Sequence, residues 1–144
     1  MEPSDVTMLL CDAAQQVGGK LYILGGGWSL IFAPGPISCA LAIKLAVPWD
    51  EANRRITFRI ALLDEDGNGV NLGQGPVVAT GGLEVGRPPG LKPGTSIDAP
   101  FVLSFASLVL GAGGYVFDLE VNGQSLARAP FRVLDAPPMP PRLG

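Results

Sequence analysis

The stretch SCALAIKLAV, residues 38–47, alternates large apolar side chains with small or polar ones. One side of an extended chain would carry Cys39, Leu41, Ile43, Leu45 and Val47, and the other Ser38, Ala40, Ala42, Lys44 and Ala46. A period of two residues is that of a β-strand with one face in a hydrophobic core. The stretch therefore predicts a half-buried strand whose second face is lined mainly by alanine.

The same period recurs along the chain, as in RITFRIALLD (residues 55–64), and turn residues interrupt it. Further strands are expected at residues 6–11, 20–24, 28–32, 77–85, 101–110, 115–121 and 127–134, with Asp12 ending the first of them. The 20 glycines and 14 prolines fall mainly between these runs, where they form turns. About eight or nine short strands predict an all-β, immunoglobulin-like Greek-key β-sandwich, with a small Greek-key barrel as the alternative.

The last hairpin, YVFDLEVNGQSLARAPFRV, indicates its own register. A three-residue NGQ loop, or a two-residue turn with a bulge, places Phe117 opposite Ala129 in the core and Asp118 opposite Arg128 outside it. A plain two-residue turn would bring Arg128 onto the core face. The pattern therefore predicts the longer or bulged connection.

Composition limits the class of protein. With 144 residues the chain is expected to form one sandwich domain over residues 1–136, followed by a Pro-rich tail at residues 137–144. Its 47% hydrophobic and 16% charged residues indicate an ordered core and a surface partly covered by a partner. The net charge of −3 argues against nucleic-acid binding. No stretch resembles a signal peptide or a membrane span, so we expect a cytoplasmic protein that does not bind membranes.

The sequence contains no histidine. This excludes Ser-His-Asp and Cys-His nucleophiles and histidine-ligated metals, so we expect a protein that is not an enzyme and holds no cofactor. Cys11 and Cys39 both fall in strand-like runs. In a reducing compartment they are expected to be small buried hydrophobic residues, with a disulfide between them as the alternative.

The segment DEDGNG, residues 64–69, matches the first half of a calcium-binding loop through Asp64, Asp66 and Asn68. The closing acid is missing, because Gly75 occupies its position, and the flanking patterns are strands rather than helices. A hairpin turn is therefore favoured, and the three residues remain as calcium candidates.

Two further short patterns have a structural and a functional interpretation. Pro137, Pro140 and Arg142 fit a polyproline ligand, although an extended tail explains the same composition. Trp28 and Trp49 stand at strand ends, where aromatic side chains often anchor partners. Core or core-edge packing is the more common role of such tryptophans.

Three consecutive glycines, residues 25–27, precede Trp28. They follow a strand, as a phosphate-binding loop does, but the chain continues as another strand and lacks the Lys-Ser/Thr pair of such loops. The glycines therefore predict a β-bulge or a crossing of the chain between sheets.

The segments VTMLLCDAAQ and GGKLYILGGGWS (within residues 6–29), AIKLAVPWDEANRRITFRIALLDEDG (residues 42–67) and PFRV (residues 130–133) resemble a family of short bacterial proteins, notably actinobacterial. That family is known only as a domain of unknown function. The resemblance implies a small, cytoplasmic, β-rich protein and brings no catalytic residues with it.

The expected function is that of a non-enzymatic interaction or assembly module that associates with itself or with another protein. The alanine-lined face suggests the contact surface, with Ala40, Ala42, Lys44 and Ala46 as candidates beside Trp28 and Trp49. The alternative is a module that binds a small ligand or calcium, through residues 64–69 or through a cleft between Trp28 and Trp49.

Overall fold

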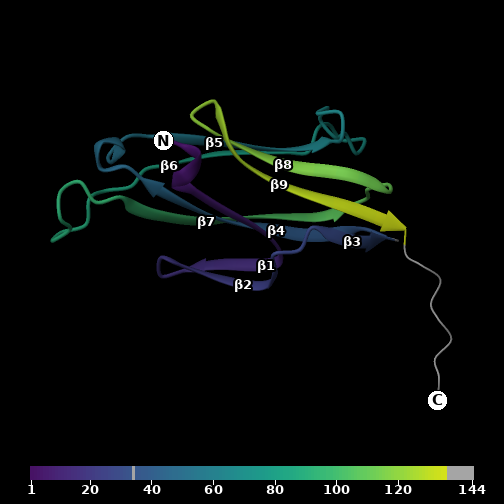
Figure 1. Ribbon diagram of the computed structural model, residues 1–144, viewed down its shortest axis with the longest axis horizontal. Coiled ribbons are helices and arrows are strands. Elements are labelled where there is room, and N and C mark those ends of the chain that lie inside the picture. Colours follow the sequence, from purple (N-terminus) through teal and green to yellow (C-terminus); the bar gives the residue numbers. More distant parts are fainter. Residues whose placement is uncertain (34, 136–144) are drawn as a thin grey trace, which may run out of the picture.

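The computed structural model describes residues 1–33 and 35–135, and nine β-strands run through that part of the chain. Sheet A has the order β2 (Lys20–Gly26), β1 (Val6–Val17), β4 (Ile37–Val47), β7 (Ile97–Leu108). Sheet B has the order β3 (Leu30–Ala33), β9 (Gln124–Asp135), β8 (Gly113–Val121), β5 (Ile56–Asp64), β6 (Val78–Leu83). The two sheets pack on one another without closing into a ring (Figure 1), so the sandwich is confirmed and the barrel alternative is wrong.

The strand order is that of an immunoglobulin-like Greek key. The chain crosses from β4 in one sheet to β5 in the other and returns through β7 before it enters β8 and β9. At the start of β8 the Tyr115 hydroxyl donates a hydrogen bond of 2.8 Å to the Gly111 carbonyl. A tyrosine in this place, bonded to the backbone a few residues upstream, is a hallmark of the fold. The expected fold class is therefore confirmed.

The hydrophobic core lies between the two sheets. Leu41, Ile43 and Leu45 on β4 are fully buried, as the alternation of that stretch predicts. They belong to one cluster with Phe117 of β8 and Phe131 of β9, whose ring centroids are 5.6 Å apart. Each buried side chain of this size stabilises the fold by about 1.5–3 kcal/mol. The core therefore depends on residues whose period-two spacing is visible in the sequence.

The C-terminal hairpin has the predicted register. Phe117 pairs with Ala129, and Asp118 pairs with Arg128 on the outer side. The connection is a two-residue turn between Val121 and Gln124, and the register shifts between Leu119 and Glu120. The second predicted form, a two-residue turn with a bulge, is therefore the one that the chain adopts.

The three glycines mark a change of sheet. β2 belongs to sheet A and ends at Gly26, whereas β3 begins at Leu30 and pairs in parallel with β9 in sheet B. Gly25 and Gly27 have positive φ angles of 61° and 87°, which residues with a Cβ rarely adopt. The predicted crossing between sheets is confirmed, and the crossing carries Trp28.

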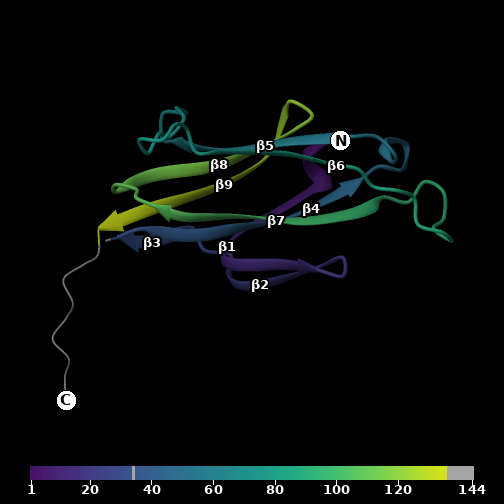
Figure 2. The same cartoon turned by 180° about the vertical axis from the view of Figure 1, so that it is seen from behind.

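The first strand is longer than the sequence pattern indicates. β1 does not end at Asp12 but continues to Val17 and pairs with β2, so residues 12–26 form a hairpin, called here the hairpin arm. The expectation was wrong because AAQQ has no apolar alternation. Figures 1 and 2 show this arm as a third layer, on the side of β4 and β7 that faces away from sheet B.

Helical structure in the described residues amounts to two single 3-10 turns, η1 (Pro3–Asp5) and η2 (Trp49–Glu51). The second lies between β4 and β5. No helix in the described part of the chain has the length and apolar character needed to cross a membrane.

Candidate interaction site

The hairpin arm leaves sheet A at Cys11. Up to that residue β1 pairs with β4, where Cys11 lies opposite Ala40. Beyond it β1 pairs only with β2, and the arm closes through the two-residue turn Gly18-Gly19. Both glycines have positive φ angles, 59° and 77°, as a type I′ turn requires. The amide N–H of Gly27 then bonds to the Leu10 carbonyl at 2.8 Å, so the chain returns to the point where the arm began.

The inner side of the arm covers the alanine-lined face of β4. Ala14 and Leu21 of the arm pack against a small buried cluster of Cys11, Ala40 and Ala42. Ala40 and Ala42 are only 1% and 2% exposed. They were expected to meet another molecule, but a segment of the same chain occupies that surface. Alanine suits this contact because its short side chain lets a third layer approach closely.

Lys44 and Ala46, the other two candidates on this face of β4, are half-buried. The Lys44 ammonium lies 3.6 Å from the carboxylate of Asp98 on β7. This exposed ion pair contributes little stability, because water screens it. The part of the alanine-lined face that remains near the surface is therefore small and partly charged.

The arm also carries several exposed apolar side chains. Among the described residues, eight large hydrophobic side chains are exposed, and four of these are Val17, Tyr22, Ile23 and Leu24. Tyr22 is 57% and Leu24 71% exposed. An open hollow of about 410 Å³ lies here, lined by Ala13, Ala14, Gln15, Tyr22, Ile23 and Leu24. Such a concentration of exposed apolar surface is typical of a contact with another molecule.

The two tryptophans lie at opposite ends of the sandwich. Trp28 lies just before β3, near the end of β9, and its ring meets Phe131 edge-on at 6.1 Å. Trp49 follows the C-terminal end of β4, and the Arg87 guanidinium lies over its ring, 4.3 Å from the ring centroid. The two rings contact different parts of the chain, Phe131 and Arg87, and among the described residues no contact joins them as a cleft between Trp28 and Trp49 would require.

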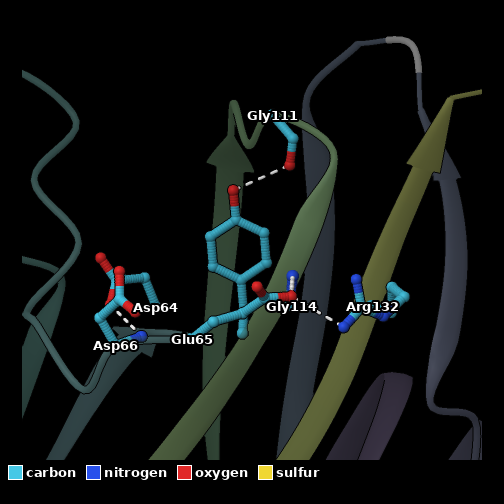
Figure 3. Close-up of polar contacts among 7 residues, drawn as sticks. Asp64, Glu65, Asp66, Gly111, Gly114 and Arg132 are labelled. Atoms are coloured by element: carbon cyan, nitrogen blue, oxygen red, sulfur yellow. Dashed lines mark hydrogen bonds and ion pairs between the residues drawn. The ribbon is translucent and has the colours of Figure 1, made fainter.

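Residues 64–69 form a tight turn at the end of β5 (Figure 3). The Asp64 carboxylate oxygen Oδ1 accepts hydrogen bonds from the backbone N–H groups of Asp66 and Asn68, at 2.9 and 3.0 Å. Asp64 therefore has a clear role in closing the turn. Nowhere in residues 1–33 and 35–135 do three or more Asp, Glu, Cys or His side chains converge as a metal would need.

A second hollow, of about 560 Å³, lies on the outer face of sheet B beside this turn. Glu65 belongs to its lining. Its carboxylate accepts hydrogen bonds of 2.7 Å from the Gly114 N–H and from the Arg132 guanidinium (Figure 3). Arg128, also in its lining, donates to Asp118 at 3.0 Å. Both arginines of this hollow are thus paired with carboxylates. The Glu65–Arg132 pair has no signal in the sequence, because 67 positions separate its members.

Both cysteines are free and buried. The Cys11 thiol donates a weak hydrogen bond of 3.4 Å to the Ala40 carbonyl. Burial raises the pKa of Cys11, and burial raises the pKa of Cys39 to about 11. Both thiols therefore stay protonated and unreactive near neutral pH. The Pro137, Pro140 and Arg142 pattern lies outside the described residues.

The hairpin arm is the main feature that the sequence interpretation missed. One signal for it was present, since two glycines between Val17 and Lys20 are typical of a two-residue hairpin turn. The pairing partner of residues 20–24 was not visible, because Ala13 to Gln16 lack the alternation of a half-buried strand.

Comparisons with known proteins place the chain in a family without giving it an activity. No curated protein matches it. The match to a family of unknown function (DUF6941) extends over residues 6–134, nearly the whole described fold, and the chain therefore belongs to that family.

Proposed function

We propose that the protein is a non-enzymatic assembly module that associates with itself through the hairpin arm. The observation that supports this most directly is the exposure of Val17, Tyr22, Ile23 and Leu24 on one short segment. Burial of apolar surface is the main favourable term in protein association, at about 25 cal/mol per Å² of area removed from water. The arm is therefore the part of the described surface with most to gain from a contact.

The charged hollow on sheet B supports a catalytic role less well. Its two arginines are held by Glu65 and Asp118, and the sequence has no histidine to act as a base near neutral pH. Free, buried thiols at Cys11 and Cys39 suit a reducing compartment, and we propose a cytoplasmic location. A bacterial origin, implied by the resemblance of the sequence, belongs to the same proposal.

Sedimentation velocity tests the proposal on the whole chain from about 1 to about 200 µM, a range over which a weak dimer changes population. The wild type should rise above the monomer mass of 14.9 kDa with concentration. The double substitution Tyr22→Ser and Leu24→Ser should return it to the monomer at the same concentrations. Val109→Ser, at a side chain 65% exposed outside the arm, is the matched control and should change nothing.

Two results would count against the proposal. One is a wild type that stays at 14.9 kDa at the highest concentration. The other is self-association that the double substitution leaves intact. Circular dichroism of each variant shows whether the sandwich is still folded, so loss of association is not confused with unfolding.

A further inference from the structure

The free edge of β2 differs from the other free strand edges among the described residues. The sheets end at four strands, β2 and β7 in sheet A and β3 and β6 in sheet B. β7 contains Pro100 and the charged Asp98, β3 has four residues, and β6 has only three residues before Gly81-Gly82. Proline, charge and short length are devices that keep an edge from pairing with another strand. β2 has five residues, KLYIL, before its own two glycines, with no proline and only one charge.

The turn of the arm determines which backbone groups of β2 are free. In a hairpin closed by a two-residue turn, the residues that flank the turn form a hydrogen-bonded pair, here Val17 and Lys20. Every second residue from Lys20, including Tyr22 and Leu24, then bonds to β1. The N–H and C=O groups of the residues between them, Leu21 and Ile23, point away from β1.

We propose that two copies of the protein join by antiparallel pairing of their β2 strands about a two-fold axis at Ile23. The two hairpin arms then form one four-stranded sheet. This inference rests on the proposed function and names the geometry of that self-association. The Ile23 N–H and C=O of each copy bond to those of the other, which satisfies the groups that β1 leaves free.

The register centred on Ile23 is the one that the residues favour. It overlaps all seven residues of β2, including Gly25 with its positive φ of 61°. It also places Tyr22 opposite Leu24 of the second copy, an aromatic–aliphatic pair that stabilises antiparallel strands. A shift of two residues in either direction leaves only five residues paired. Each Lys20 lies opposite Gly26 of the other copy, so the two ammonium groups stand about 20 Å apart, well beyond the screening length of about 8 Å.

Disulfide trapping of single-cysteine variants tests this geometry. Cα atoms of a hydrogen-bonded antiparallel pair are about 5.5 Å apart, within disulfide range, so Ile23→Cys should form a covalent dimer in oxidised glutathione. Tyr22→Cys is the matched control, because diagonal neighbours lie about 7–8 Å apart, and it should cross-link about tenfold less. Native Cys11 and Cys39 are buried, and the pKa of each is raised, so they do not compete.

A backbone substitution gives a second, independent readout. Ile23→Pro removes the N–H that points to the second copy and leaves the bonds between β1 and β2 in place. It should raise the dissociation constant in sedimentation by about tenfold or more, since one hydrogen bond from each copy is lost. Ile23→Val keeps the N–H and the branched side chain and should behave as the wild type. Thermal unfolding followed by circular dichroism confirms that each variant is folded.

The outcomes separate this inference from the proposed function. If the wild type associates but Ile23→Cys cross-links no better than Tyr22→Cys, and Ile23→Pro still associates, edge pairing is wrong while self-association stands. Preferential cross-linking of Tyr22→Cys would indicate a register shifted by two residues and would overturn the axis at Ile23. A wild type that is monomeric at every concentration removes both proposals.

Discussion

Trp28 shows how one side chain can fit both a core and a binding interpretation. It follows the three glycines at the crossing between sheets, and its ring packs edge-on against Phe131 at the border of the main core. Its indole Nε1 is buried and has no hydrogen-bond partner among the described residues. The ring thus contributes apolar contact, while its polar atom carries the cost of an unpaired buried donor.

We expect Trp28→Phe and Trp28→Ala to separate these two contributions. Phenylalanine keeps most of the aromatic contact and removes the unpaired N–H, so the free energy of unfolding should change by less than about 1 kcal/mol. Alanine leaves a cavity beside Phe131 and should cost about 3 kcal/mol. Guanidinium unfolding followed by circular dichroism measures both. An equal loss in the two variants would show that Nε1 has a partner in solution and that the indole itself is needed.

At the scale of elements, the turn after β5 can be tested by substitution, because its two aspartates have different roles and should differ in their effect on stability. Asp64 accepts two backbone N–H bonds within the turn, whereas the Asp66 side chain is exposed. Asp64→Ala should therefore lower the free energy of unfolding by about 1 kcal/mol, as loss of such a cap typically does. Asp66→Ala should change it by less than about 0.5 kcal/mol.

Added calcium tests the alternative interpretation, that residues 64–69 bind the ion. If residues 64–69 bind the ion, added calcium should raise the melting temperature of the wild type, and both substitutions should abolish the increase, because a ligand stabilises the state that binds it. If the aspartate closes the turn, the melting temperature stays the same with and without calcium, and only Asp64→Ala lowers it. Differential scanning fluorimetry measures both melting temperatures.

Some elements were predictable from the sequence and others were not, for a physical reason. The register of β8 and β9 followed from Phe117 and Arg128, because only one pairing keeps the aromatic ring inside and the guanidinium outside. The hairpin arm offered no such constraint, since Gln15 and Gln16 fit either a strand or a loop. Its stability comes from a tertiary contact, Leu21 and Ala14 on Ala40 and Ala42, which one strand's pattern does not reveal.

The same contact explains why the candidate site moved from β4 to the arm. The alanine-lined face of β4 indicated a contact surface, but the sequence pattern does not distinguish a second molecule from another part of the chain. Once the arm covers Ala40 and Ala42, the arm itself carries exposed apolar side chains. The candidate contact surface thus lies on the arm, one layer further from sheet B than the face of β4 that was expected to form it.

At the scale of the whole molecule, the arm is an addition to the sandwich rather than a part of its core. The main cluster of buried residues lies between the sheets and includes no residue from 12–26. The chain enters and leaves the arm at neighbouring points, because Cys11 pairs with Gly26. An immunoglobulin-like domain without the arm would run from Cys11 toward β3 with a short connection.

Replacement of residues 11–26 by Asn-Gly tests this division of roles. The Gly27 N–H already bonds to the Leu10 carbonyl at 2.8 Å, which is the bond that closes a two-residue type I′ turn, so the shortened chain should close without strain. It should unfold cooperatively, with a loss of about 2 kcal/mol from the exposure of Ala40 and Ala42, and it should remain monomeric in sedimentation velocity. Gly18→Asn, which keeps the same turn type at a position with free space for a Cβ, is the control and should associate as the wild type does. A shortened protein that still associates would place the contact elsewhere on the sandwich, whereas one without cooperative unfolding would show that the arm is needed for the fold.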